Sequence, residues 1–250
     1  MHENRVEFEI YGNYALFSDP ITRVGGEKCT YQIPTYEGIK GALHSIYWKP
    51  TIIWIIDEVR VMNYIQMESK GIRPIKYNGG NDLSYYTYLK ECRYQVRAHF
   101  IFNENRPELK QDRNENKHHN IAKRAIMKGG RRDVFLGTRE CQAYVKPCVF
   151  GEGKGAYDDV ELLSFGRMVP AFTYPDEAYS EDTKDKLSVR FWNAEMRKGV
   201  ITYPKPWECT GNNLRIIKPY PMKRFGTEWS NFKNIEEEER ELVSKVHSDV

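Results

Sequence analysis

The stretch CRYQVRAHFIF, residues 92–102, decides the fold because its side chains alternate in character along its whole length. Every second residue, starting at Tyr94, is apolar or aromatic. Polar or basic side chains fill the positions between them, namely Arg93, Gln95, Arg97 and His99. Successive side chains of a β-strand point to opposite faces of its sheet, so this stretch predicts a strand with two unlike faces. We expect the apolar face to pack on helices and the basic face to lie open to an anionic ligand.

Three further segments predict the other strands of the same sheet. Residues 5–11 alternate between apolar side chains and acidic or polar ones, which is typical of a half-buried first strand. Residues 51–64 begin with the apolar, β-branched run TIIWIID and predict a second strand. Residues 134–145 predict a fourth strand, which Gly137 interrupts.

Two helices are predicted between these strands. Thr35 is a good N-cap for a segment whose apolar residues recur at helical spacing, and Pro50 stops this segment just after Tyr47 and Trp48. A second helix follows a polar loop and ends at the glycine pair of residues 129–130, which is a typical C-cap. Both helices therefore have a stop signal, and the first also has an N-cap.

The order of these elements is β-α-β-β-α-β over residues 5–145, which is the ferredoxin-like split βαβ topology shared by RNA-recognition modules. Beyond it, glycine and proline turn signals separate short strand-like runs, and residues 236–246 predict a terminal helix. We therefore expect an α+β protein of two parts. Residues 1–145 form a ferredoxin-like domain for RNA binding and catalysis, and residues 146–250 form a smaller β-rich C-terminal domain with a charged tail.

Composition and charge limit the class of protein. The chain has 250 residues, of which 40% are hydrophobic, so it can bury its own core. No run approaches the roughly 18 apolar residues of a membrane span, and the start MHENRVEFEI lacks the basic and apolar regions of a secretory signal. We expect a cytoplasmic protein with no membrane partner. The net charge is only +3, but residues 110–140 hold nine Lys and Arg against four Asp and Glu, which favours a nucleic-acid partner.

The topology also predicts a cluster of reactive side chains at one edge of the sheet. The two helices of a split βαβ fold run antiparallel, so the end of the first lies near the start of the second. Tyr47 and Trp48 then approach the residues that open the second helix, Lys117, His118 and His119.

A phenol, an ammonium and an imidazole suit RNA cleavage by the substrate's own 2′-hydroxyl. A base removes the hydroxyl proton, an acid protonates the leaving oxygen, and a cation stabilises the phosphorane. The alternative is structural: Tyr47 packs in the core, and Lys117 and His118 are solvated residues of a first helical turn.

Arginines beside glycines predict a phosphate-binding segment. Glycine lets the backbone approach a phosphate closely, and Arg131, Arg132 and Arg139 supply the charge. The alternative for this segment is a helix cap followed by a strand bulge. Arg93 and Arg97, on the basic face of the central strand, are further candidates for RNA binding.

No metal or cofactor is expected from the sequence. The five cysteines include no CxxC pair. His118 and His119 are adjacent, and adjacent side chains on a helix point about 100° apart, so they cannot hold one ion together. No group of carboxylates has a spacing that suits magnesium-dependent hydrolysis.

Five stretches together resemble a known family. They are YALFSDPITRVGGEK (residues 14–28), SIYWKPTI (45–52), IDEVRVMNYIQMESKGIRPI (56–75), NENKHHN (114–120) and GGRRDVFLGTRECQAYV (129–145). From residue 5 to residue 207 the chain closely resembles the d-subtype of the fifth CRISPR-associated (Cas) protein family, of type I-C systems. That family belongs to the RAMP superfamily, so the resemblance implies an N-terminal ferredoxin-like domain and a β-rich C-terminal part.

The resemblance also implies an activity and partners. Members cleave precursor CRISPR RNA at the base of the repeat hairpin without a metal and leave a 2′,3′-cyclic phosphate. They then stay bound to the 5′ handle of the mature crRNA, beside the backbone and large subunits of the effector complex. The main alternative is a subunit that binds the handle without cutting RNA.

The catalytic residues of the family fall on Tyr47, Lys117 and His118 of this chain. Members have a single histidine followed by an aromatic residue, whereas His119 follows His118 here. Either imidazole is therefore a candidate for the catalytic histidine.

Overall fold

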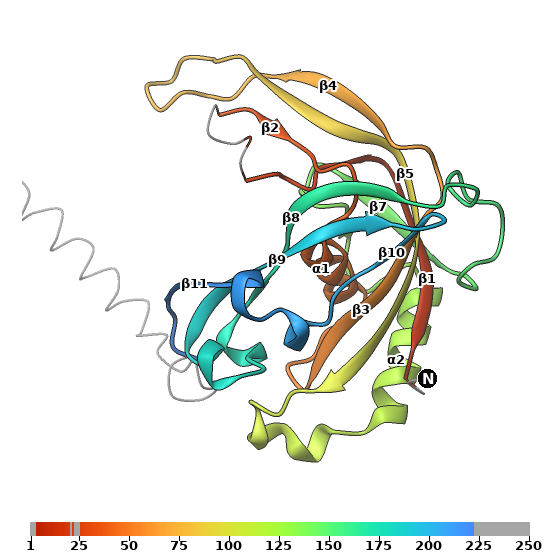
Figure 1. Cartoon of the computed structure of the whole chain (residues 1–250), viewed down its shortest axis with the longest axis vertical. Helices are drawn as coiled ribbons and strands as arrows, with labels where there is room; N and C mark the ends of the chain where they lie inside the picture. Colours follow the sequence, from red (N-terminus) through yellow and green to blue (C-terminus); the bar gives the residue numbers. More distant parts are fainter. Residues whose placement is uncertain (1–3, 21, 23–25, 223–250) are drawn as a thin grey trace, which may run out of the picture.

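Strand β5 (Ser84–Phe102) runs through the middle of the large sheet and contains the alternating stretch that the sequence singled out (Figure 1). The computed structural model describes residues 4–20, 22 and 26–222. The terminal helix predicted for residues 236–246 lies outside the described residues. The strand is longer than the predicted residues 92–102, because its first half continues into a long hairpin.

Four strands pair directly with β5. β1 (Val6–Ala15) and β3 (Ile52–Val61) flank it on opposite sides, both antiparallel. β4 (Gln66–Ile72) forms the hairpin with its first half, and β2 (Lys28–Cys29) runs parallel to that half. Every other part of the large sheet is reached through β1 or β3.

The arrangement of the strands and helices agrees with the predicted fold class. α1 (Tyr36–Ile46) follows β1 in the chain, and α2 (Glu115–Met127) follows β5. The main strands of the sheet lie in the order β3–β5–β1–β7, where β7 is Gln142–Pro147. The α+β class predicted from the sequence is confirmed, and this strand order supports the ferredoxin-like interpretation.

The fourth predicted strand is divided at Gly137. β6 (Val134–Phe135) and β7 are two short paired strands, and Gly137 lies in the turn between them with φ of +91°. A Cβ atom at this position would lie 2.0 Å from the carbonyl oxygen of Leu16, so the two backbones approach each other too closely for any other residue.

α1 begins after Thr35, the cap that its sequence predicts, whereas α2 begins at Glu115, inside the stretch predicted as a polar loop. The hydroxyl of Thr35 accepts a hydrogen bond from the backbone N–H of Gly38 at 3.1 Å, which caps α1. The side-chain oxygen of Asn114 accepts a hydrogen bond from the N–H of Lys117 at 2.9 Å, which caps α2. These caps fix where the first turn of α2 lies, and that turn carries His118.

The C-terminal part contributes a second sheet and one strand of the first. β8 (Leu163–Thr173), β9 (Lys186–Met196) and β11 (Leu214–Pro219) form the second sheet, in the order β11–β9–β8. β10 (Val200–Thr202) follows β9 in the chain but pairs antiparallel with β3 at the edge of the large sheet. Short 3₁₀ helices occupy several connections: η2 Pro107–Asp112, η3 Pro175–Glu177, η4 Glu181–Thr183, η5 Pro206–Glu208 and η6 Gly211–Asn213.

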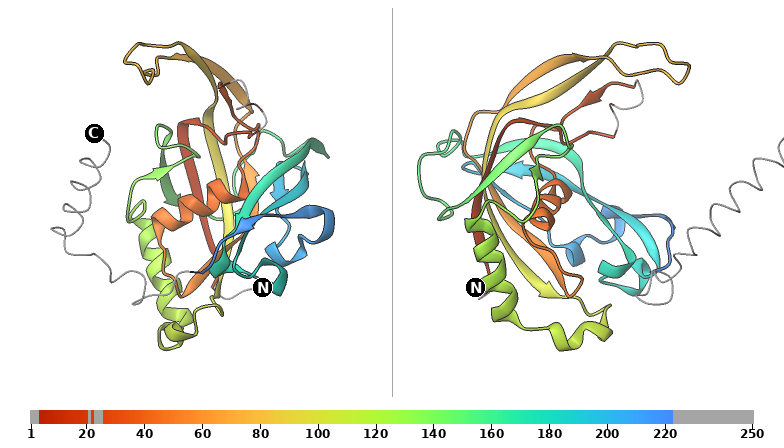
Figure 2. Two further views of the ribbon diagram at one scale, coloured as in Figure 1. Left: turned by 90° about the vertical axis from the view of Figure 1, so that its left-hand side faces the viewer. Right: turned by 180° about the vertical axis from the view of Figure 1, so that it is seen from behind.

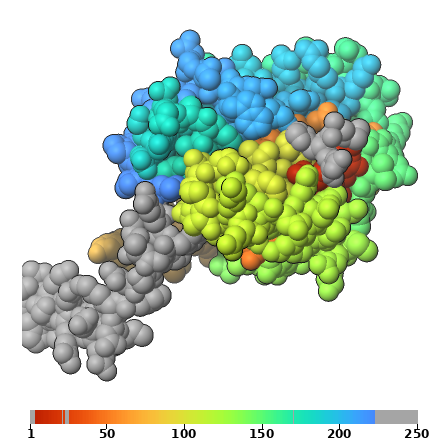
Figure 3. Space-filling model, turned by 90° about the horizontal axis from the view of Figure 1, so that it is seen from below, coloured from red at the N-terminus to blue at the C-terminus, as the bar shows by residue number. Residues whose placement is uncertain are grey.

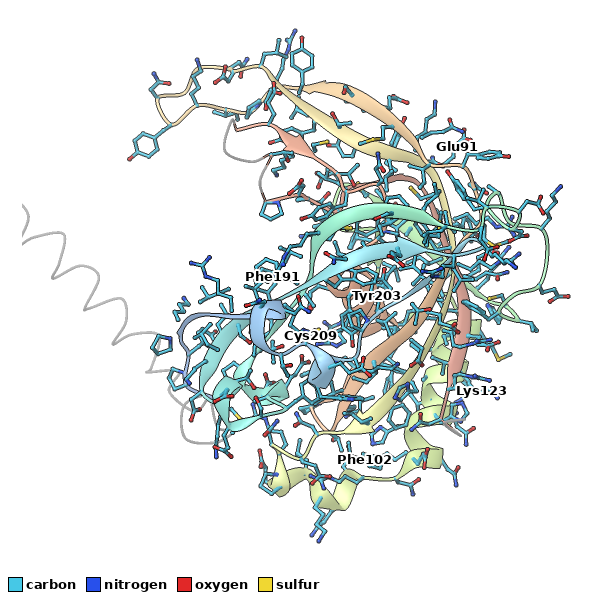
Figure 4. The ribbon with its side chains drawn as sticks, in the orientation of Figure 1. Glu91, Phe102, Lys123, Phe191, Tyr203 and Cys209 are labelled. Atoms are coloured by element: carbon cyan, nitrogen blue, oxygen red, sulfur yellow. The ribbon has the colours of Figure 1, made fainter. Side chains whose placement is uncertain are left out.

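One hydrophobic cluster joins residues of both parts of the chain. α1 lies between the large sheet and the second sheet (Figures 1 and 2). Tyr203, labelled in Figure 4, is buried there, and its hydroxyl donates to the carbonyl of Pro34 at 2.5 Å. Met168 and Met196 of the second sheet belong to the same cluster as Phe8 of β1. The division of the chain near residue 145 stays a prediction.

The expectation that the basic face of β5 lies open is wrong for much of its length. Residues 148–158, which we call the covering segment, cross this face. Gln95 donates to the carbonyl of Glu152 at 2.8 Å, and the buried Arg60 of β3 contacts both carboxylate oxygens of Asp158 at 2.8 Å. A buried guanidinium needs acceptors for its N–H groups, and the covering segment supplies them.

Candidate active site

Tyr47 and His118 meet through one short hydrogen bond. Tyr47 is the C-cap of α1, and its carbonyl accepts a hydrogen bond from the indole N–H of Trp54 at 2.8 Å, which fixes the backbone there. His118 lies in the first turn of α2. The Tyr47 hydroxyl oxygen is 2.7 Å from Nδ1 of His118. Tyr47 is 1% exposed and His118 is 0% exposed, so this contact is shielded from water.

The second nitrogen of His118 determines the tautomer. Nε2 lies 2.8 Å from the backbone carbonyl oxygen of Asp112. A carbonyl oxygen only accepts hydrogen bonds, so Nε2 carries a proton. In the neutral imidazole Nδ1 is then the acceptor, and the Tyr47 hydroxyl donates its proton to it. The phenol oxygen keeps a lone pair that can accept another proton.

The surroundings of Tyr47 keep its phenol neutral at pH 7. Burial raises the pKa of Tyr47, and the negative charge of Asp112 raises it further. The positive charge of Arg131 opposes this shift. Its guanidinium carbon lies 5.9 Å from the centre of the Tyr47 ring.

Asp112 links the residues of the site, and sequence reasoning missed it. Its carboxylate accepts a hydrogen bond from the Thr51 hydroxyl at 2.7 Å and forms an ion pair with Lys117. One carboxylate oxygen lies 3.5 Å from Nε2 of His118. Asp112 ends the 3₁₀ helix η2, immediately before the residues that cap α2. The signal in the sequence was an acidic residue in a predominantly basic segment, two positions before the N-cap Asn114.

A basic pocket of about 270 Å³ lies beside Tyr47. Its lining residues are His44, Ser45, Tyr47, Trp48, Lys49, Pro50, Arg131 and Arg132. The backbone N–H of Arg132 donates to the carbonyl of Ser45 at 3.2 Å, which ties the segment after α2 to the end of α1. Figure 3 looks onto the side of the molecule where η2 and α2 form much of the surface. The pocket could hold an anionic group close to the phenol.

His44 is a second imidazole of this pocket that the sequence analysis did not single out. Burial and the neighbouring charge of Lys40 lower the pKa of His44 to about 4, so the ring is neutral at pH 7. Its ring centre lies 6.3 Å from that of Trp48. The sequence carries no signal for a functional role of His44, because it is a single histidine in the last turn of α1.

The structure separates the two candidate histidines. His119 is half-buried, and its Nε2 lies 3.1 Å from the backbone carbonyl of Arg5, at the start of β1. Only His118 is bonded to Tyr47. Lys117 is exposed and joins the group through Asp112 rather than through Tyr47.

The other predicted RNA-binding residues do not gather in one place. Arg131 and Arg132 line the pocket beside Tyr47, whereas Arg139 is exposed in the turn between β6 and β7. Arg93 and Arg97 lie on the face of β5 that points away from the helices. Each already contacts carboxylates: Arg93 contacts Glu9 at 2.8 Å, and Arg97 contacts Glu7 at 3.0 Å and Glu58 at 2.5 Å.

The described part of the chain holds neither a cluster of metal ligands nor a membrane-spanning helix. Within residues 4–20, 22 and 26–222, no group of three or more His, Cys, Asp or Glu side chains is placed to hold a metal ion. No helix in these ranges is long and apolar enough to cross a membrane.

Fold and site together define a class: an α+β protein in which two helix ends bring a tyrosine and a histidine beside a basic pocket. A family model described as CRISPR-associated protein (Cas_Cas5), with the name Cas_Cas5d, matches residues 6–204. The chain therefore belongs to the Cas5d family of CRISPR-associated proteins.

Individual proteins and solved structures that resemble this chain are consistent with membership of this family. A protein of Mannheimia succiniciproducens named CRISPR pre-crRNA endoribonuclease Cas5d is 26% identical over 231 residues, which cover 80% of this chain and 95% of that protein. A crystal structure of a CRISPR-associated protein is 34% identical with a TM-score of 0.70, over 84% of this chain and 96% of that one. A functionally uncharacterised protein of Streptococcus mutans has the same coverage, with 36% identity and a TM-score of 0.69.

The network around Asp112 predicts a pH-dependent stability. Hydrogen bonds from Lys117 and Thr51 hold the pKa of Asp112 below its ordinary value. A carboxyl group whose pKa is lowered by folding stabilises the protein at neutral pH, and this stabilisation disappears as the pH falls through the lowered pKa. We expect Asp112→Asn to lower the free energy of unfolding at pH 7 and to lower it less at pH 3. Urea unfolding of both proteins at the two pH values measures this difference.

Asp133→Asn is the matched control, because Asp133 is an exposed carboxylate in the same basic segment. We expect it to change the free energy of unfolding little at either pH. An equal loss for Asp112→Asn at pH 7 and pH 3 would contradict the network.

Proposed function

We propose that this chain is a metal-independent endoribonuclease that cleaves precursor CRISPR RNA at the base of the repeat hairpin. Two relatives named CRISPR pre-crRNA endoribonuclease Cas5d support this activity. The observation that carries the proposal is the 2.7 Å hydrogen bond between Tyr47 and His118, beside a pocket lined by Arg131 and Arg132. No cofactor is required, because the RNA supplies its own nucleophile, the 2′-hydroxyl next to the scissile phosphate.

Tyr47 and His118 form a proton relay in this mechanism. The proton of the 2′-hydroxyl passes to the phenol oxygen of Tyr47 while the phenol proton passes to Nδ1 of His118. The 2′-oxygen bonds to the adjacent phosphorus, and the 5′-oxygen leaves. His118 becomes an imidazolium, which the carbonyl and carboxylate of Asp112 stabilise from 2.8 and 3.5 Å. Because His118 is fully buried, it acts through Tyr47 and does not touch the RNA.

Positively charged side chains stabilise the phosphorane and protonate the leaving group. The phosphorane carries extra negative charge, and the arginines of the pocket stabilise it where it develops. The exposed ammonium of Lys117 donates a proton to the leaving 5′-oxygen. The products are an upstream fragment that ends in a 2′,3′-cyclic phosphate and a downstream fragment with a free 5′-hydroxyl.

The remaining arginines hold the RNA backbone. Arg131 and Arg132 bind phosphates at the pocket, and Arg139 extends this contact along the turn between β6 and β7. Arg93 and Arg97 bind phosphates on the other face of the sheet, through the N–H groups that their carboxylate partners leave free. Such contacts position RNA and carry little sequence information.

After cleavage the chain stays bound to the 5′ handle of the mature crRNA in the cytoplasm. Its protein partners are the backbone and large subunits of a type I-C effector complex. A second candidate function is a non-catalytic subunit that only binds the handle. The burial of His118 favours this alternative, because a fully buried imidazole is not open to a ligand and acts on RNA only through Tyr47, which lines the pocket.

Substitution of each histidine tests the assignment of the base. We expect His118→Ala to lower the single-turnover cleavage rate of the repeat RNA by roughly 10² to 10⁴, since this is the usual contribution of a proton-transfer group. RNA affinity should stay within a few fold. Tyr47→Phe, which removes only the hydroxyl, should lower the cleavage rate by as much. His119→Ala is the matched control and should keep the parent rate. Full activity in His118→Ala and Tyr47→Phe would favour the binding subunit, and a dead His119→Ala would move the base to His119.

The salt dependence of binding tests Arg131 and Arg132. Removal of one phosphate-binding cation lowers the slope of log K against log salt by about 0.7 for single-stranded RNA. We expect the double alanine variant to lower the slope by about 1.4 for all RNA sequences alike, as measured by fluorescence anisotropy over a salt series. Lys123→Ala with Arg124→Ala removes the same charge from the exposed side of α2, where Figure 4 labels Lys123, and should keep the parent slope. A parent slope in the Arg131 and Arg132 variant would place these residues outside the interface.

Deoxyribose substitution tests the nucleophile. We expect a single 2′-deoxyribose upstream of the scissile phosphate to block cleavage while binding persists, because the attacking oxygen is then missing. EDTA should leave the rate with the all-ribose repeat unchanged, and mass spectrometry should find a cyclic phosphate on the upstream fragment. Efficient cleavage of the deoxy-substituted repeat would mean that water attacks, as in metal-dependent hydrolysis.

A further inference from the structure

The face of the large sheet that carries no helix presents a pair of exposed tyrosines that the cleavage site does not use. Tyr11 of β1 and Tyr144 of β7 are direct partners in the sheet register. Their ring centres lie 5.8 Å apart with the planes tilted by 34°. Tyr11 is 38% exposed and Tyr144 is 55% exposed. Phe8 and Ile10 of β1 belong to the buried core, and Tyr11 points to the opposite face.

The covering segment stops short of these two rings. On β5 it contacts Gln95 and Arg97: Gln95 bonds to Glu152, and the ring of Phe150 packs under the Arg97 guanidinium at 4.1 Å. The next row of the sheet toward the hairpin is different. Arg93, Tyr11 and Tyr144 are register partners across β5, β1 and β7, and all three are exposed in whole or in part. This row of the helix-free face therefore remains open.

Two cations flank the tyrosines and share a single carboxylate. Arg93 lies 2.8 Å and Lys146 lies 2.9 Å from the oxygens of Glu9, whose side chain is 3% exposed. Although burial works against it, the contacts with Arg93 and Lys146 hold the pKa of Glu9 below its ordinary value, so the carboxylate is ionised. Two positive charges and one negative charge leave a net positive charge beside the rings. The ammonium of Lys146 also lies 5.4 Å from the centre of the Tyr11 ring.

We propose that Tyr11 and Tyr144 form a stacking platform for unpaired bases of single-stranded RNA, with Arg93 and Lys146 on the neighbouring phosphates. Exposed aromatic rings on an open sheet face are how compact RNA-binding domains hold unpaired bases, and paired bases are not available for such stacking. Exposed cations on both sides of the rings suit a ligand that carries one negative charge per nucleotide. The proposal rests on the proposed function for its RNA but adds a second contact, on the face of the sheet opposite to Tyr47.

A comparison of alanine and phenylalanine variants tests the platform. Base stacking contributes about 1 to 3 kcal/mol per base, so we expect Tyr11→Ala with Tyr144→Ala to weaken binding of a single-stranded RNA oligonucleotide at least 5-fold. Tyr11→Phe with Tyr144→Phe should bind within 2-fold of the parent, because stacking needs the ring and not the hydroxyl. The salt slope should not change in either variant, because every phosphate-binding cation is kept. Tyr174→Ala, at an exposed tyrosine just beyond β8, is the matched control and should bind like the parent.

Three results would overturn the platform. They are parent affinity in the double alanine variant, an equal loss in the double phenylalanine variant, and a loss of association with a protein subunit while RNA affinity is kept. Urea unfolding of each variant shows whether the fold is retained, and exposed rings on a sheet face should change it little.

The cleavage rate distinguishes a failure of the stacking platform from a failure of the proposed endoribonuclease function. With enzyme at saturating concentration, the double alanine variant should cut the repeat RNA at the parent rate, because both rings lie on the sheet face away from Tyr47. A parent protein that binds RNA but does not cut it would refute the proposed function, and the alanine and phenylalanine comparison would still decide the platform.

Discussion

The pairing of β5 with β1 on one side and β3 on the other is the interaction on which the rest of the structure depends. β5, the first strand of the second βαβ half, lies between β1 and β3 of the first half, so the helices that follow β1 and β5 lie antiparallel on one face. The end of α1 and the start of α2 then meet. Tyr47 and His118, which are far apart in the chain, are bonded at 2.7 Å as a direct result.

Local signals predicted much of this arrangement, because alternation and helix caps depend on residues a few positions apart. The strand at β5 and the cap Thr35 followed from them, and the order of the elements then predicted the meeting of Tyr47 with the start of α2. Three features did not follow, because each depends on contacts between distant segments. Asp112 reaches the site only when η2 folds against Thr51, the covering segment is held by Arg60, and β10 of the C-terminal part joins the large sheet beside β3.

Charge counted along the sequence describes the surface poorly. Arg93 and Arg97 were prominent in the alternating stretch, yet β1 and β3 bring Glu7, Glu9 and Glu58 opposite to them. Register sets these partners, and a sequence without known register does not reveal them. Arg131 and Arg132 differ, since no carboxylate within the described ranges forms an ion pair with either of them. The pocket beside Tyr47 therefore keeps the positive charge of both arginines.

The return of β10 to the edge of β3 has a consequence for synthesis of the chain. β3 is complete by residue 61, but its outer edge from Glu58 to Arg60 is covered only when Val200–Thr202 has left the ribosome. Until then an apolar strand presents unpaired backbone groups, which is the feature that promotes pairing between chains. The last third of the polypeptide thus protects its first third. A nascent chain that ends before residue 200 retains an unpaired strand edge that can pair with another chain.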